Sequence, residues 1–203
     1  MLQHTKLETS LDRFVRETRA LFALEVDPER RWTLLGPVLA DLLADPLVVA
    51  ASKTWPECRM IENRIENLLF YEDPDYKFVI NGLVLSDPAG GAGRVHDHAH
   101  IYTLYGLLDG RQRIERYERL DDRSQPERAE IRKTSDTACG PGEIDLVRPF
   151  EIHSEDSVGE RAVAVIVRSE VSGGFLQGRY ELGTNRYWQG YGPRQKPLPF
   201  FPN

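Results

Sequence analysis

The histidines of this chain are concentrated at alternate positions near its middle. Three of the five histidines lie in the segment His96-Asp97-His98-Ala99-His100, and His153 follows about fifty residues later. Side chains two residues apart in a β-strand point to the same face, so the three imidazoles of this segment would share one side. Because imidazole is the commonest side-chain metal ligand, the pattern predicts a metal held inside β-structure. The alternative is a histidine-rich surface strand with no ligand role.

The elements that must position these histidines begin with a helical part. Residues 1–55 carry apolar positions at helical spacing, and Gly36-Pro37 is expected to kink or split the middle helix. We expect these helices to cap a β-body, with a dimer contact as the alternative use. The helix starts are marked by capping residues, namely Thr9 or Ser10, Asp27-Pro28 and Asp45-Pro46.

A β-rich part and a terminal arm follow the helices. Many short apolar segments bounded by turn residues, without helices between them, predict a barrel or a sandwich. The last part, 184–203, is rich in aromatic residues, Gly and Pro and fits neither a helix nor a strand. We expect it to be a lid over the barrel, an arm that reaches a neighbouring subunit, or a passive tail. The expected strands are 58–63, 66–71, 76–85, 94–107, 111–119, 128–134, 143–148, 151–156 and 161–169.

Composition limits the classes of protein that this chain can be. With 26 basic and 32 acidic residues, the formal net charge of −6 argues against nucleic acid or an anionic membrane as a partner. No apolar run approaches the roughly 20 residues of a membrane span, and charged residues interrupt the N-terminus where a signal peptide would lie. Cys58 and Cys139 form no CxxC pair. We therefore expect a cytoplasmic globular protein.

The glycines around the histidine segment give it a recognisable spacing. Five residues separate Gly90 from His96, and Gly110 follows as a tight hairpin turn. This order resembles the first motif of the cupin superfamily, except that Tyr102 or Thr103 holds the position of the motif's glutamate.

The stretch in which His153 follows Pro149 resembles a degenerate form of the second cupin motif. The resemblance implies a mainly β fold, the cupin double-stranded β-helix (jelly-roll) barrel, with an N-terminal α-helical cap. It implies a single domain over residues 1–203, divided into a cap (1–55), a barrel (56–183) and a C-terminal arm (184–203). The metal ligands it implies are His96, His98 and His153.

Because its first motif lacks a carboxylate, the chain resembles one branch of the cupins, that of cysteine dioxygenase and 3-mercaptopropionate dioxygenase. This likeness implies bound Fe2+ and oxidation of a small anionic substrate, a thiol first of all, with O2. Two departures weaken it, because residues 162–168 lack the branch's Ser-His-Tyr relay and residues 67–71 lack its substrate arginine. Zn2+, Mn2+ or Ni2+ at the same ligands would instead serve an isomerase or lyase, and a third alternative is a non-enzymatic metal- or ligand-binding cupin.

Further side chains are candidates for catalysis or substrate binding. Tyr102 could hydrogen-bond the substrate, and His100 could be a fourth ligand, a proton shuttle or a core histidine. Arg94 and Arg168 could hold a substrate anion, because guanidinium binds a carboxylate through two hydrogen bonds; surface ion pairs are the alternative. Arg168 is also a candidate for a catalytic role. The expected partners are this small molecule and O2, and a homodimer is left open.

Overall fold

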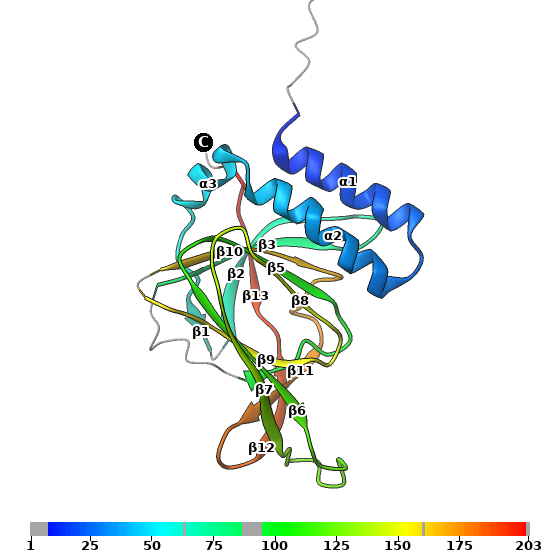
Figure 1. Ribbon diagram of the computed structural model, residues 1–203, viewed down its shortest axis with the longest axis vertical. Helices are drawn as coiled ribbons and strands as arrows, with labels where there is room; N and C mark the ends of the chain where they lie inside the picture. The colour runs from blue at the N-terminus through cyan, green and yellow to red at the C-terminus, as the bar shows by residue number, and fades with distance from the viewer. Residues whose placement is uncertain (1–7, 63, 87–94, 160, 202–203) are drawn as a thin grey trace, which may run out of the picture.

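Three helices precede thirteen strands in the computed structural model, which describes residues 8–62, 64–86, 95–159 and 161–201 (Figure 1). Thr9 caps the first helix through a reciprocal capping box with Asp12. Asp27 and Asp45 cap the next two, each accepting a hydrogen bond from a first-turn backbone N–H at 2.8 Å. The expected helix starts are thus confirmed. The helices are α1 (Ser10–Leu24), α2 (Pro28–Leu43) and α3 (Pro46–Ser52).

The Gly36-Pro37 pair does not split the middle helix, because α2 runs unbroken across it. Proline removes one backbone hydrogen bond, and the buried face formed by Trp32, Leu35 and Leu39 continues on both sides of it. Packing of this face outweighs the local preference to break.

The strands form two sheets, most of whose pairings are antiparallel. The seven-stranded sheet contains β1 (Met60–Ile61), β2 (Arg64–Glu72), β3 (Val79–Leu85), β5 (Thr103–Asp109), β8 (Ile144–Val147), β10 (Ala162–Arg168) and β13 (Arg194–Pro197). The six-stranded sheet contains β4 (Val95–His96), β6 (Gln112–Arg119), β7 (Ile131–Cys139), β9 (Ile152–Ser157), β11 (Leu176–Glu181) and β12 (Arg186–Tyr191).

Strand order confirms the jelly-roll expected from the sequence. Four neighbours of one sheet are β3-β10-β5-β8, and four of the other are β4-β9-β6-β7. The chain crosses repeatedly from one sheet to the other, and the resulting strand order is that of a double-sheet jelly roll. The helices lie against the outer face of the seven-stranded sheet (Figure 1).

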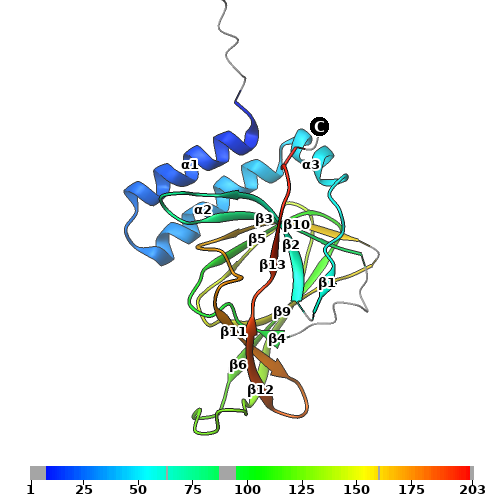
Figure 2. The ribbon, with the colours of Figure 1, turned by 180° about the vertical axis from the view of Figure 1, so that it is seen from behind.

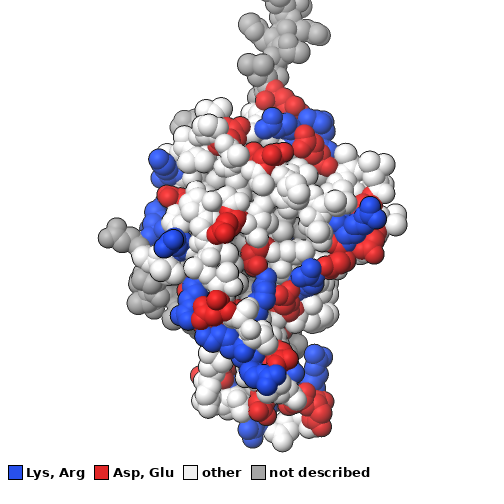
Figure 3. Space-filling model, viewed as in Figure 1, with Lys and Arg blue, Asp and Glu red and all other residues white. Residues whose placement is uncertain are grey.

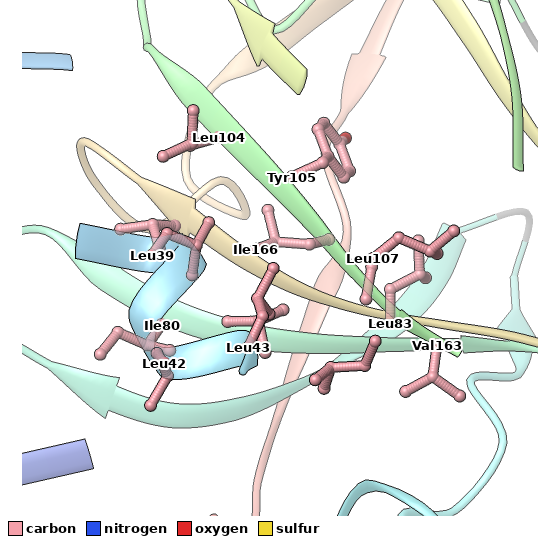
Figure 4. Packing of buried hydrophobic residues seen from close by; sticks show 14 of the residues in the cluster. Leu39, Leu42, Leu43, Ile80, Leu83, Leu104, Tyr105, Leu107, Val163 and Ile166 are labelled. Carbon is pink, nitrogen blue, oxygen red and sulfur yellow. The ribbon is translucent and has the colours of Figure 1, made fainter. Parts of the chain in front are cut away.

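The helical cap shares one hydrophobic core with the sheet beneath it. Leucines of α2 lie over strands β3, β5 and β10 (Figure 4). Gly106 permits this close approach, since a Cβ there would lie 2.7 Å from Leu43 Cδ1. The expected packing of helices on a β-body is therefore what the structure shows.

The C-terminal part corrects the sequence interpretation. Strands β11, β12 and β13 were not expected, and the arm 184–203 contains two of them. β13 runs parallel to β2 (Figure 2), and Phe200 beyond it packs against Trp55 and Phe70. The Trp55 indole N–H donates to the Phe200 carbonyl at 3.1 Å. The arm is thus tied to the body of the same chain along most of its length.

The helices were compared with the length and apolar composition that a membrane span requires. Within the described ranges no single helix is long and apolar enough to cross a bilayer, whereas α2 and α3, bent by 80° between them, pass that test only as a pair. On the face shown in Figure 3, Lys and Arg are interspersed with Asp and Glu. The expectation of no nucleic-acid partner stays a prediction.

A buried carboxylate joins the first helix to the sheet. Asp73, in the β2–β3 turn, has a fully buried side chain and accepts hydrogen bonds from Arg19 of α1 at 2.6 Å and from the Tyr71 hydroxyl at 3.0 Å. The backbone N–H groups of Asp75 and Tyr76 also donate to it. Burial acts to raise the pKa of Asp73, but these hydrogen bonds outweigh it and leave the pKa below its ordinary value.

We predict that Asp73→Ala lowers the free energy of unfolding by about 2–4 kcal/mol, because four donors lose their acceptor. Asp75→Ala removes the exposed partner of the same arginine and should cost less than about 1 kcal/mol. Because folding lowers the pKa of Asp73, its contribution is complete above about pH 4 and falls as pH drops further. Urea unfolding at several pH values tests both points; a wild-type advantage that is unchanged down to pH 3 would contradict the second.

Candidate metal centre

The histidine segment crosses from one sheet to the other. A single strand over 94–107 was expected, but β4 ends at His96 in the six-stranded sheet and β5 begins at Thr103 in the seven-stranded sheet. Between them Ala99 has a φ of 52°, a conformation that side chains rarely adopt. The alternation of side chains is therefore lost after His98, and the residues that follow cannot be assigned to a face by counting.

Asp97 holds this crossover in place. Its buried carboxylate accepts from the backbone N–H groups of Ala99 at 2.8 Å and Gly178 at 3.0 Å, and from the Tyr180 hydroxyl at 2.8 Å. A Cβ on Gly178 would lie 2.2 Å from the Asp97 carboxylate, so glycine is required at this contact. These contacts fix the backbone between two candidate ligands, His96 and His98.

Three imidazoles converge inside the barrel. His96 of β4 lies opposite His153 of β9 in the antiparallel register, and His98 follows just beyond β4. The Nε2 atoms of His96 and His98 are 3.1 Å apart, and one nitrogen of each of the three rings lies within 4.8 Å of the others. His98 and His153 are 2% and 1% exposed. The predicted set of three histidines is thus brought together.

The state of these rings suits a cation. His153 Nδ1 lies 3.3 Å from the Glu151 carbonyl oxygen, so Nε2 is the nitrogen left to face a metal. Burial, and next the charges of His153 and His96, lower the pKa of His98 well below its ordinary value. Burial acts to lower the pKa of His153 too, but the hydrogen bond and charge of Glu155 outweigh it and raise that pKa. The convergent nitrogens fit a divalent transition metal, which binds imidazole in its neutral form, and nitrogen donors alone do not select which metal.

Two functional residues were missed by sequence reasoning. Glu155 of β9 has a carboxylate oxygen 3.2 Å from His153 Nε2, and Tyr105 of β5 donates to the other oxygen of Glu155 at 3.1 Å. The Tyr105 hydroxyl is also 3.3 Å from His98 Nε2. Glu155 follows His153 by two residues in an expected strand, so its position on the same face could have been found. Tyr105 could not, because the crossover intervenes.

The electrostatics of the two residues are linked. Burial acts to raise the pKa of Glu155, but the charges of His96 and His153, with hydrogen bonds, lower it to about 2. Burial and the charge of Glu155 raise the pKa of Tyr105 well above its ordinary value. The centre therefore contains a buried carboxylate and a neutral hydroxyl beside the imidazoles, whereas the first motif alone indicated no carboxylate.

His96 and His98 line a cavity of about 120 Å3. Arg168, at the end of β10, lines it and is 2% exposed. Its guanidinium donates to Asn81 Oδ1 at 2.8 Å, and the Asn67 amide, with its oxygen turned inward, accepts at 3.2 Å. Within the described ranges Arg168 forms no ion pair, and its Nε has no acceptor. The other lining residues include Arg64, Arg179, Gln177, Ile65, Leu83, Leu85, Tyr191, Gly192 and Pro193.

Two predicted catalytic residues lie away from this cavity. His100 is a surface residue whose Nε2 is 2.9 Å from Glu170. Tyr102 stacks on Trp32 of α2 at a centroid distance of 5.8 Å, and its hydroxyl donates to Glu29. The structure therefore places neither Tyr102 where it could hydrogen-bond a substrate in the cavity nor His100 where it could be a fourth ligand, a proton shuttle there or a core histidine, because the crossover after His98 turns both side chains away. Arg94, predicted to bind substrate, lies outside the described residues, and Arg168 is the one arginine of that pair that the structure places at the site.

Comparisons with known proteins found partial likenesses to solved structures. No family model and no curated sequence matches the chain. The cupin domain of Schizosaccharomyces pombe Cnp3 is similar over 52% of this chain and 60% of that domain, with 10% identity and a TM-score of 0.38. Hydroquinone 1,2-dioxygenase PnpCD in complex with Cd2+ and 4-hydroxybenzonitrile covers 74% of this chain and 75% of its own, with 11% identity and a TM-score of 0.41.

A third similar structure is recombinant oxalate oxidase in complex with glycolate, with 15% identity and a TM-score of 0.35 over 46% of this chain and 42% of the oxidase. The chain thus spans less than two thirds of both the oxidase and the Cnp3 domain. Because these likenesses are partial, the chemistry of the site has to come from its own residues.

We predict that Tyr180→Phe weakens metal binding about tenfold, because Asp97 loses a hydrogen bond that fixes the segment between His96 and His98. Tyr187 contacts the Tyr180 ring, so Tyr187→Phe is a matched control that leaves Asp97 untouched and should bind metal as the wild type does. Competition titration with a chromogenic chelator measures both affinities. Equal affinity in the two variants would show that Asp97 needs no support from Tyr180.

Proposed function

We propose that this chain is a metal-dependent enzyme of the cupin type, and specifically a non-haem Fe(II) dioxygenase that oxidises a small anionic substrate with O2. One observation carries the proposal. Three largely buried imidazoles converge, and two of them, His96 and His98, line a small cavity together with a buried arginine, Arg168, that has no carboxylate partner among the described residues. A buried cation without a counter-ion is costly, and a substrate anion would supply the missing charge.

Different residues would bind the metal and the substrate. His96, His98 and His153 would hold the ion, which when bound as Fe2+ supplies electron transfer to O2 and otherwise, as a redox-inert ion, Lewis acidity. Arg168, oriented by Asn81 and Asn67, would bind a carboxylate or similar anion.

The remaining walls suit a small organic substrate. Ile65, Leu83 and Leu85 line the cavity with apolar surface, which excludes water and strengthens the charge interactions inside it. The Tyr105 hydroxyl lies between His98 and Glu155, where it can hold or pass a proton. A volume of about 120 Å3 is similar to cavities that admit one benzene-sized molecule.

A small thiol carboxylate is the substrate class that the first histidine motif favours. Wild-type protein loaded anaerobically with Fe2+ should take up O2 when such thiols are added, and His153→Ala, which loses a ligand, should retain neither stoichiometric iron nor uptake. An oxygen electrode and elemental analysis measure the two quantities. No uptake with iron, beside turnover of a small carboxylate with Mn2+ or Zn2+, would favour an isomerase or lyase instead. Bound metal without turnover under any condition would indicate a non-enzymatic metal- or ligand-binding protein.

We predict that Arg168→Gln raises KM for an anionic substrate about 100-fold, because a charged hydrogen bond is worth about 3 kcal/mol. Arg148→Gln, the same change at a half-exposed arginine paired with Glu29, should leave KM unchanged. Metal content should be equal in the two variants. A KM that does not move in Arg168→Gln would assign Arg168 to structure alone.

A further inference from the structure

The site contains one oxygen atom that the three-histidine proposal leaves unused. Glu155 Oε1 accepts from the Tyr105 hydroxyl, whereas Oε2 faces the imidazoles, 3.2 Å from His153 Nε2 and 3.8 Å from His96 Nε2. Within the described ranges, neither Oε2 nor His153 Nε2 has a hydrogen-bond partner, although both are buried. Buried polar atoms are rarely left without a partner.

These two atoms face each other. His153 Nδ1 faces the Glu151 carbonyl oxygen, so Nε2 is the ring nitrogen that faces the Glu155 carboxylate. Two electron-rich atoms at that separation repel each other unless a proton or a metal lies between them. A cation shared by both would satisfy the two atoms at once.

The separations agree with ligands of a single ion. With metal–ligand distances of about 2.1 Å, neighbouring ligand atoms on one ion are roughly 3.0–3.4 Å apart. The pair His96 Nε2–His98 Nε2, at 3.1 Å, and the pair His153 Nε2–Glu155 Oε2, at 3.2 Å, both fall in this range. These two pairs therefore have the spacing of neighbouring ligands, whereas Glu155 Oε2 lies 3.8 Å from His96 Nε2 and would have to move closer to the histidines on metal binding.

We propose that Glu155 is a fourth protein ligand of the metal, supplied by β9, and that Tyr105 positions it. The inference rests on the proposed metal site. It differs from the sequence expectation of a centre with three histidines and no carboxylate. The carboxylate missing at Tyr102 or Thr103 would be provided two residues after the last histidine, on the same face of its strand.

The charge at the centre changes accordingly. Three neutral imidazoles leave a divalent ion with its full charge, whereas Glu155 would reduce the net charge to about +1. The open positions would then favour a singly charged or neutral donor atom from the substrate, with Arg168 free to bind a second, anionic group. The ligand class that follows is a small carboxylate with one additional donor atom.

Glu155→Gln tests this ligand role, because the amide keeps the size of the side chain but is a poor metal ligand. We expect the affinity for Co2+, used as a spectroscopic probe, to fall at least about 30-fold, and the visible absorption of bound Co2+ to change in position and intensity. Glu118→Gln makes the same change at an exposed side chain of β6 that is paired with Arg132. This control should keep the wild-type affinity and spectrum.

Two results would overturn the proposal. One is a Glu155→Gln variant with wild-type Co2+ affinity and spectrum, which would make Glu155 only a counter-ion to His153. The other is a crystal structure of Co2+-loaded wild-type protein in which the Glu155 carboxylate lies well outside the roughly 2.0–2.2 Å of a metal–oxygen bond. The crystal structure needs no variant, so it decides the matter even if Glu155→Gln does not fold.

Tyr105→Phe separates positioning from ligation. It removes the hydrogen bond to Oε1 but no proposed ligand, so the affinity should fall about tenfold while the Co2+ spectrum keeps the wild-type form. If wild-type protein binds no Co2+ at all, the proposed function fails together with this inference. If the wild type binds Co2+ and loses it in His96→Ala but not in Glu155→Gln, the inference alone fails.

Discussion

The centre depends on one antiparallel register, in which His96 of β4 lies opposite His153 of β9. Side chains directly opposite each other on one face of such a pair have Cβ atoms about 4.5–5.5 Å apart. The pairing therefore brings together two rings that are remote in sequence, and it also brings Glu155, two residues along the same strand. A shift of one residue would turn both β9 side chains to the other face. The flanking strands β6 and β11 hold this register from both sides.

The helical cap and a barrel or sandwich of strands could be predicted because their signals are local, whereas the jelly-roll itself was implied by the resemblance of the histidine motif to the cupins. Capping residues such as Asp27 and Asp45 mark helix starts, and short apolar segments between turns mark strands whichever sheet they join. The three terminal strands carried no such signal. β12 is largely exposed and interrupted by Gly190, and β13 ends in Pro197 at a parallel edge. β12 pairs with β11 and β13 pairs with β2. Such pairing between distant segments cannot be predicted from the local sequence.

The ligand histidines could be predicted and the residues around them could not, for one reason. Counting by twos is valid while the chain remains a regular strand, so it placed His96 and His98 correctly and would have placed Glu155. It fails at Ala99, where the backbone leaves the extended conformation. Tyr102 and His100 were assigned to the site across that break, and Tyr105, which lies beyond it, was overlooked.

Charge balance connects the centre with its substrate. The buried groups of the cavity are neutral His98, the carboxylate of Glu155 and the guanidinium of Arg168, and a bound divalent ion would add two positive charges. One negative group cannot offset three positive charges in a region that excludes water, and the cost of leaving them uncompensated is high. An anionic substrate, as proposed above, would complete the electrostatics of the cavity as well as occupy it, and selectivity for anions would then follow from the buried charges themselves.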